Sequence, residues 1–254
     1  MSMLSRKAYS AIHDLIVSGE IPAASTISEA ALAKRLRVSR TPVREAVRQL
    51  TQEGLLEQIP RRGTLVRSVD RRELAELYHI REALEGHAAG QAAGRVTAPQ
   101  LAQLGLLVEE MEKMAGVAAR SKEQQLARDA RLKELAMDKA FHMLILEVAG
   151  NRRMIELIRA TRVMSDFFQL QLQTQPRRLV DQAVVHHKRI LDALRARDAA
   201  KASAAMSGHI RCGLEEALQH FDQLHLYSGK ASESVLGGLP GGLRKKLAAL
   251  NDAG

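Results

Sequence analysis

The chain has 254 residues, 46% of them hydrophobic, which is enough to bury the cores of two globular domains. Its formal net charge of +9 predicts salt-dependent binding to a polyanion, whereas an aromatic content of 3% argues against the stacking platforms that bind single-stranded nucleic acid. The single cysteine excludes an internal disulfide and no apolar run approaches a membrane span, so we expect a cytoplasmic protein without a membrane partner.

Two short amphipathic segments come first in the chain. Residues 5–18 carry Ile12 and Ile16 on one apolar face, which predicts a first helix. Residues 28–36 show the same spacing and predict a second helix. The following residues, 37–40, form a connection of the length found in helix-turn-helix motifs. We therefore expect the second helix to meet the next one at a tight corner.

Residues 38–50 predict a third helix with two contrasting faces. Thr41 is the expected N-cap, and Pro42 is tolerated at the first helical position because no backbone N–H is needed there. The apolar face consists of Val43, Val47 and Leu50. Another face is cationic and carries Arg40, Arg44 and Arg48. Guanidinium groups bind guanine edges and phosphates, so the pattern predicts a recognition helix for the major groove, although the arginines alone also fit a solvated surface helix.

A β-hairpin is predicted after the recognition helix. Residues 55–59 and 64–67 are strand-like runs. Residues 60–63 join them, and Gly63 permits the positive φ angle of a tight turn. Arg62 makes the tip of the hairpin basic. The third helix is thus followed by a wing.

This N-terminal pattern resembles the winged helix-turn-helix of the GntR family of transcription factors, in its FadR subfamily. The resemblance covers roughly residues 5–70 and rests on the run VSRTPVREAV at residues 38–47. It implies that residues 1–70 form a domain that binds double-stranded DNA. The positions implied to contact DNA are Ser39, Arg40, Thr41, Arg44, Arg62 and Gly63. The cationic face of the helix adds Arg48.

Residues 71–227 predict an all-α bundle, because apolar residues recur at helical spacing and no strand signal is found. Breaks that divide the region into about six helices fall near residues 96–99, 116–122, 149–151, 174–176 and 197–198. The expected fold is therefore mainly α, with a winged helix-turn-helix of three helices and a β-hairpin ahead of the bundle. Residues 228–254 are rich in glycine and are expected to form a flexible tail.

Polar residues interrupt the apolar faces of several predicted helices. Asp138 and His142 are four residues apart and share a helical face with Ile145. His187 lies on an apolar stripe, and His209 has small residues as helical neighbours. Each of these groups would cost free energy if it were buried without a partner. Taken singly, each histidine fits a hydrogen-bonded core residue or a solvent-facing one.

As a set, these residues resemble the metal-binding members of the FCD type of effector domain, over about residues 72–226. The resemblance implies that a divalent cation at the base of a ligand cavity is held by a tetrad of Asp138, His142, His187 and His209. Such ligands suit Zn²⁺, with Ni²⁺ or a similar ion as the alternative, and leave room for ligand oxygens. An organic acid is the expected effector. Arg81 matches a cavity arginine of relatives; the alternative is a salt bridge to Glu85 within its helix.

The two halves of the chain predict a ligand-responsive transcriptional regulator and no enzymatic activity. We expect a homodimer on a palindromic operator, acting as a repressor, with operator affinity controlled by a small carboxylate-type metabolite at the metal. A metal-dependent hydrolase is the second reading, because an open metal position can activate water. Against it, no general acid or base is placed near the tetrad. A constitutive DNA binder with a structural metal is the third reading.

Overall fold

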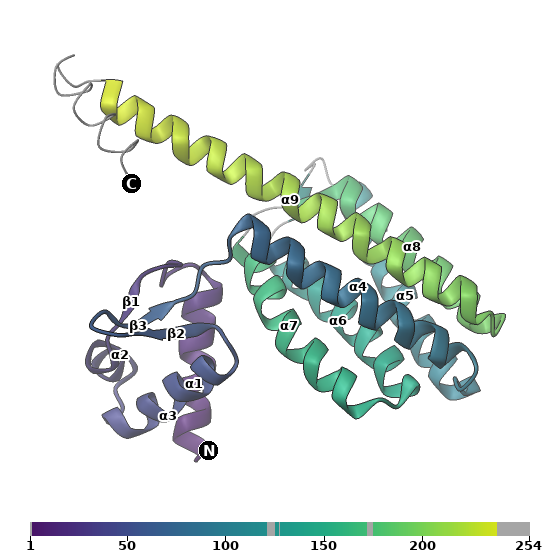
Figure 1. The fold of residues 1–254 in the computed structure, drawn as a ribbon, viewed down its shortest axis with the longest axis horizontal. Coiled ribbons are helices and arrows are strands. Elements are labelled where there is room, and N and C mark those ends of the chain that lie inside the picture. The colour runs from purple at the N-terminus through teal and green to yellow at the C-terminus, as the bar shows by residue number, and fades with distance from the viewer. Residues whose placement is uncertain (1, 121–124, 127, 172–174, 238–254) are drawn as a thin grey trace. The chain divides into compact units, whose positions relative to one another are not determined.

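The computed structural model describes residues 2–120, 125–126, 128–171 and 175–237 (Figure 1). The chain divides into a compact unit of residues 1–214 and a second unit of residues 215–254. The first unit contains an N-terminal domain with a small sheet and most of the helical domain that follows. The boundary with the second unit falls inside the last helix of the chain.

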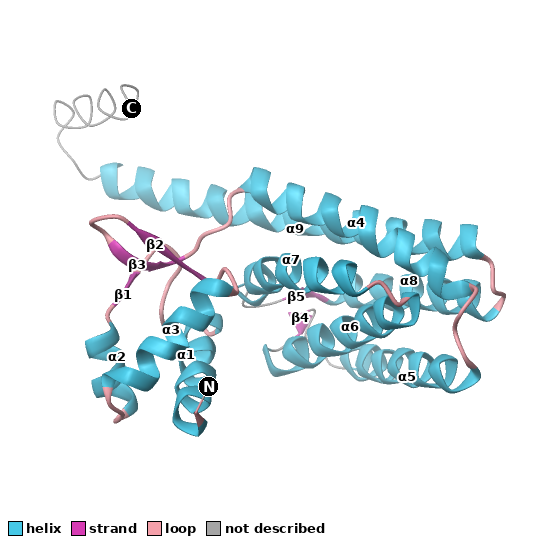
Figure 2. Ribbon diagram, turned by 60° about the horizontal axis from the view of Figure 1, so that its bottom comes forward, coloured by secondary structure: helices cyan, strands magenta, loops and turns pink. Residues whose placement is uncertain are grey.

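Helices with a common apolar core make up most of the N-terminal domain (Figure 2). They are α1 (Met3–Val17), α2 (Glu29–Leu36) and α3 (Arg40–Gln52), which correspond to the predicted segments. Both α1 and α2 pack against α3. The buried side chains include Ile12, Ile16, Leu32, Val43, Val47 and Leu50. The predicted apolar face of the recognition helix is therefore part of the core, and its phase is confirmed.

The corner between α2 and α3 depends on its capping residues. Ser28 caps α2 by accepting a hydrogen bond from the backbone N–H of Ala31, and Arg37 ends α2 in the left-handed region with φ 54°. Ser39 is the N-cap of α3, so the prediction of Thr41 at that position is wrong. Ser39 is the last residue with extended backbone, and Pro42 then falls within the first helical turn. The proline is tolerated there because the N–H groups of a first turn have no helical acceptor.

The wing is an antiparallel hairpin of β2 (Leu56–Ile59) and β3 (Gly63–Val66), with Gln58 opposite Thr64. Its turn contains Arg61 at φ 66° and Gly63 at φ 85°, so the predicted positive φ at Gly63 is confirmed. A further strand, β1 (Thr26–Ile27), pairs with β3 to give the order β1-β3-β2. The sequence did not predict this strand, because two residues are too short to show an alternating pattern.

The helical domain begins at α4 and contains six helices within the described residues, as predicted (Figure 1). They are α4 (Arg71–Ala93), α5 (Ala98–Arg120), α6 (Arg128–Ala149), α7 (Arg152–Gln171), α8 (Arg177–Arg195) and α9 (Ala199–Gly237). α4 packs against α6, α7 and α8, while α5 packs against α6 and α8. α6 and α8 therefore each have neighbours on more than one side, which buries the polar residues of their inner faces.

Two features of the helical domain differ from the sequence prediction. A two-residue strand pair, β4 (Gln125–Leu126) with β5 (Gln175–Pro176), lies in a region expected to contain no strand. Strands this short leave no periodic signal in the sequence. In addition, α9 continues to Gly237, past residue 228, where the sequence analysis placed the start of a flexible tail. The rest of the predicted tail, residues 238–254, lies outside the described residues.

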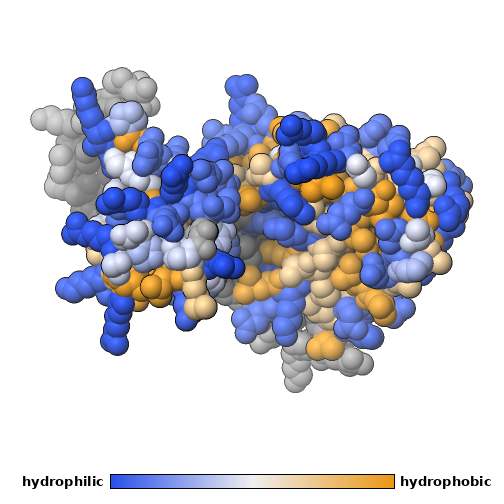
Figure 3. All heavy atoms as spheres, turned by 90° about the horizontal axis from the view of Figure 1, so that it is seen from below, coloured by the Kyte–Doolittle hydropathy of each residue, from blue (hydrophilic) through white to orange (hydrophobic). Residues whose placement is uncertain are grey.

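Hydrophilic side chains cover much of the face shown in Figure 3, with apolar patches between them. Large apolar side chains that are exposed in the helical domain include Ile80, Leu106, Leu157 and Val185. None of the helices in the described part of the chain is both long and apolar enough to cross a bilayer.

Candidate metal centre and DNA-reading surface

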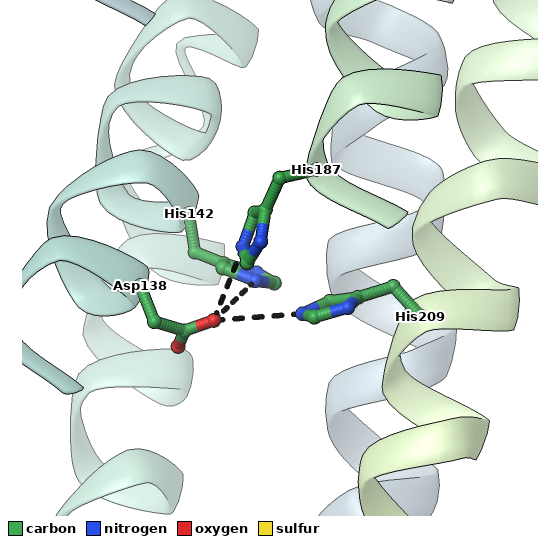
Figure 4. A group of neighbouring side chains, drawn as sticks. All are labelled: Asp138, His142, His187 and His209. Carbon is green, nitrogen blue, oxygen red and sulfur yellow. Dashed lines mark ion pairs between the residues drawn. The ribbon is translucent and has the colours of Figure 1, made fainter. Parts of the chain in front are cut away.

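Four potential metal ligands converge inside the helical domain (Figure 4). Asp138 and His142 come from α6, His187 from α8 and His209 from α9. Oδ1 of Asp138 lies 3.3 Å from Nε2 of His142, 3.2 Å from Nε2 of His187 and 3.5 Å from Nε2 of His209. One ligand atom from each residue lies within 4.8 Å of all the others. The structure thus brings together every member of the predicted tetrad.

In His142 and His187, the hydrogen bond made by Nδ1 determines which ring nitrogen carries the lone pair. Nδ1 of His187 donates to the carbonyl oxygen of Ala183 at 2.8 Å, and Nδ1 of His142 donates to a carboxylate oxygen of Glu85. In the neutral ring, a proton on Nδ1 leaves Nε2 as an acceptor. Both Nε2 atoms are buried and have no hydrogen-bond partner among the described residues.

With the histidines neutral and their Nδ1 atoms protonated, acceptor atoms face one another at the centre of the tetrad. Imidazole lone pairs and a carboxylate oxygen repel each other at these distances unless a cation lies between them. A metal ion would replace the repulsion with coordination bonds, and the two contacts at Nδ1 are of the kind that orients metal-bound histidines. The residues present fit a divalent transition metal.

The pKa values of the tetrad favour the forms that bind metal. Burial opposes ionisation of Asp138, but the imidazole groups beside it, that of His142 above all, hold the pKa of this carboxyl well below its ordinary value of 3.8. Burial and the neighbouring His187 lower the pKa of His209 from 6.5 to about 3. Near neutral pH, Asp138 is therefore an anion and His209 a neutral ligand, so neither has to lose a proton to bind a metal.

A layer of buried charges supports the tetrad, and the sequence analysis missed its central member. Arg162 on α7 is 1% exposed. Its Nη1 donates to Asp138 at 3.0 Å and its Nη2 to Glu85 at 3.1 Å. Burial opposes the charge of Arg162, but the attraction of Glu85 and Asp138 raises its pKa above the ordinary value. Arg162 shares a helical face with the buried residues Ile158 and Ser165, and this position on an apolar stripe was the signal that could have revealed it.

Arg81 takes the alternative role considered from the sequence. Its Nε donates to Oε1 of Glu85 at 2.8 Å, and its guanidinium lies 5.0 Å from the centre of the Tyr78 ring. Glu85 thus contacts Arg81, Arg162 and His142, and their attraction outweighs its burial and lowers its pKa well below 4.5. The contact of Arg81 with an effector remains a prediction.

The predicted DNA-reading residues form an exposed set on the N-terminal domain. Exposed side chains on and before α3 are those of Ser39, Arg40, Thr41, Arg44 and Arg48. Arg62 and Gly63 are exposed at the tip of the wing, next to the exposed Arg61, which the sequence analysis did not single out as a contact. Nε of Arg44 lies 3.3 Å from Oε2 of Glu29 on α2, in a pair that is open to solvent. The structure therefore leaves the cationic face of α3 accessible.

A winged helix-turn-helix followed by an all-helical domain is the architecture of a class of transcriptional regulators. Comparison with known protein families finds a match for each of the two parts of the chain. Residues 4–66 match the family described as "Bacterial regulatory proteins, gntR family", and residues 76–211 match the FCD domain. The chain belongs to the gntR family of bacterial transcriptional regulators and carries an FCD domain. Because this is a family of regulators and not of enzymes, the hydrolase reading is set aside.

Individual relatives match most of the chain. The "Probable D-xylose utilization operon transcriptional repressor" of Paenarthrobacter nicotinovorans is 30% identical over 195 residues, covering 77% of this chain and 80% of that protein. The "Nta operon transcriptional regulator" of Aminobacter aminovorans is 28% identical over 208 residues, covering 82% and 88%. The solved structure of E. coli McbR/YncC covers 87% of this chain and 100% of its own, with a TM-score of 0.70 and 21% identity, which supports the fold.

Proposed function

We propose that this protein is a metal-dependent repressor whose affinity for its operator is controlled by a small carboxylate ligand in the helical domain. In this proposal, residues 1–70 bind DNA and residues 71–227 bind the metal and the effector. The observation that carries the proposal is the tetrad, in which buried imidazole nitrogens without hydrogen-bond partners face an ionised carboxylate. That arrangement is unfavourable without a cation and therefore points to a site built for one.

Asp138, His142, His187 and His209 would hold the metal, with Zn²⁺ the best match and Ni²⁺ or a similar ion the alternative. When bound, the metal supplies a Lewis-acid position for a ligand oxygen. Glu85 and Arg162 orient the tetrad from outside by contacting His142 and Asp138. Arg81 is proposed to approach the effector carboxylate from α4, since only its Nε is used in the hydrogen bond to Glu85.

On the DNA side, we propose that the exposed face of α3 enters the major groove and that the wing contacts the backbone or the adjacent groove. The proposed contacts are Ser39, Arg40, Thr41, Arg44, Arg48, Arg62 and Gly63. A homodimer would present two such surfaces to a palindromic site. The exposed apolar side chains of the helical domain, such as Leu106 and Leu157, are consistent with self-association.

The test is an operator selection with the full chain, followed by binding measurements on the selected DNA. We expect a palindromic site, loss of binding in Arg44→Ala, and a change in affinity when zinc-loaded protein is treated with a chelator or given an organic acid. His187→Ala should retain DNA binding but lose zinc and the response to acids. Arg152→Ala, whose side chain is 92% exposed in the helical domain, is the matched control for loss of an arginine.

Two outcomes would contradict this proposal in different ways. If Arg44→Ala bound the selected DNA as well as the native protein, the proposed reading surface would be wrong. If zinc bound at the tetrad but neither chelation nor any acid changed operator affinity, the protein would be a constitutive DNA binder with a structural metal.

A further inference from the structure

Arg131 is a buried cation that nothing in the described structure neutralises by direct contact. It lies on α6 and is 2% exposed. Its Nε and Nη1 have no hydrogen-bond partner, and the described residues offer it no ion pair. Burial lowers the pKa of its guanidinium, and the attraction of Glu134 and Tyr78 only partly opposes this effect. Buried arginines are normally paired, because an isolated charge in a protein interior is strongly unfavourable.

The position of Arg131 places it in the layer of the bundle next to the tetrad. Along α6, Arg131, Glu134, Asp138 and His142 recur at helical spacing and lie on one face. Asp138 follows Arg131 after seven residues, which is about 10.5 Å along the helix axis.

Residues of α4 and α9 lie in the same layer of the bundle as Arg131. Tyr78 on α4, whose charge interaction with Arg131 was noted above, precedes Glu85 by two helical turns. On α9, Gly213 follows His209 by one turn, and a Cβ atom at Gly213 would lie 3.3 Å from the Tyr78 ring. α4, α6 and α9 therefore bring Arg131 and Tyr78 to the same side of the tetrad.

A bound metal would change the charge of this interior. Among the described residues, three guanidinium groups near the tetrad, those of Arg81, Arg131 and Arg162, are 5% exposed or less. A divalent metal held by neutral histidines would add two positive charges beside them. An anionic ligand offsets this added charge, whereas a neutral sugar or alcohol does not.

We propose that Arg131 binds the second anionic group of an effector whose first carboxylate lies on the metal, so that the effector is a small organic dianion. This inference rests on the proposed metal-dependent effector site. Dicarboxylates of roughly four to six carbons hold two carboxylates several ångströms apart, so they form a suitable series for testing this proposal.

The experiment compares matched acids on the zinc-loaded full chain. Succinate, glutarate and adipate are titrated against butyrate, pentanoate and hexanoate, which have the same carbon number and one carboxylate fewer. We expect at least one diacid to bind about tenfold or more tightly than its matched monoacid. Arg131→Met should lose this preference and bind the monoacids and zinc as the native protein does. Arg131→Lys should keep part of the preference for diacids, because the positive charge remains but the planar guanidinium with its paired donors is lost.

A measurement without any ligand separates a binding role for Arg131 from a structural one. In metal-free protein, Arg131→Met should raise the melting temperature by about 2–5 °C, because it removes an uncompensated buried charge and keeps a side chain of similar length. Lys133→Met changes an exposed cation on the same helix and should leave both melting temperature and acid binding unchanged.

The possible failures are distinguishable. A lower melting temperature in Arg131→Met, or diacids that bind no better than monoacids to zinc-loaded protein, would overturn the role of Arg131 and leave the metal site standing. Failure of the native tetrad to bind zinc would be seen before any acid is added, and it would overturn the proposed function together with this inference.

Discussion

Replacement of Glu85 by glutamine tests the charge layer that holds the tetrad. Glu85 is 1% exposed and contacts Arg81, Arg162 and Nδ1 of His142. Glutamine has nearly the same shape, so Glu85→Gln removes the negative charge without opening a cavity. The variant leaves Arg81 facing a neutral amide, while Arg162 loses one of its two carboxylate partners and keeps Asp138.

The structure sets the expected size of the effect. Neutralising one partner of a buried ion pair costs about 3–5 kcal/mol, and solvent does not screen these groups. Glutamine keeps one acceptor oxygen, so we expect a loss near the lower end, about 3 kcal/mol in the free energy of unfolding. His142 also loses the carboxylate that fixes its Nδ1 proton, and zinc affinity should fall by roughly 10- to 100-fold.

Urea unfolding of metal-free protein measures the first quantity, and zinc competition with a chromogenic chelator measures the second. Glu147→Gln is the matched control, because Glu147 on α6 is largely exposed and its distance to Arg159 is 3.8 Å. This control should change the free energy of unfolding by less than about 0.5 kcal/mol and leave zinc affinity unchanged. The expected role of Glu85 is refuted if the free energy of unfolding of Glu85→Gln lies within about 1 kcal/mol of the native value and its zinc affinity is unchanged.

Three further predictions concern the core, the tetrad and the reading surface. Leu50→Ala, at a fully buried site in α3, should lower the free energy of unfolding by about 2–5 kcal/mol, measured by urea titration. Because the pKa of His209 is about 3 when folded and 6.5 when unfolded, the unfolded state binds the extra proton between these values. Metal-free protein should therefore lose stability as pH falls from about 6.5 toward 3, and unfolding of His209→Gln should depend less on pH. Arg40→Ala should weaken operator binding by about 1–3 kcal/mol and relax the preference at one base pair, measured by competition with single-base operator variants. An equal loss of affinity for every DNA sequence would show that Arg40 contacts a phosphate instead.

The N-terminal domain could largely be predicted from the sequence because its signals are local. Val43, Val47 and Leu50 recur at helical spacing, and the helix that contains them is followed by strand runs around a glycine. Errors occurred where no local signal exists. Ser39 and Thr41 are both good N-cap residues, and only the backbone geometry separates them.

The tetrad could be predicted only because a resemblance related four distant positions to one another. Arg131 and Arg162 were missed because a basic residue on an amphipathic helix ordinarily lies at its solvent edge. Which helix covers that edge depends on how the bundle packs, and Arg162 on α7 is buried against Glu85 on α4 and Asp138 on α6, which are far away in the sequence. The same reasoning explains Glu85, whose partners come from α4, α6 and α7.

The ion pair between Arg44 and Glu29 bears on how quickly the protein finds its operator. In the free protein, Glu29 occupies the guanidinium that is proposed to read DNA, through a solvent-exposed contact of 3.3 Å. Such a pair is worth at most about 1 kcal/mol, and any DNA sequence has to displace it. We expect a correct site, where Arg44 also gains base contacts, to offset this cost better than sequences that offer phosphates alone. Glu29 should then shorten the time that the protein stays bound to non-specific DNA.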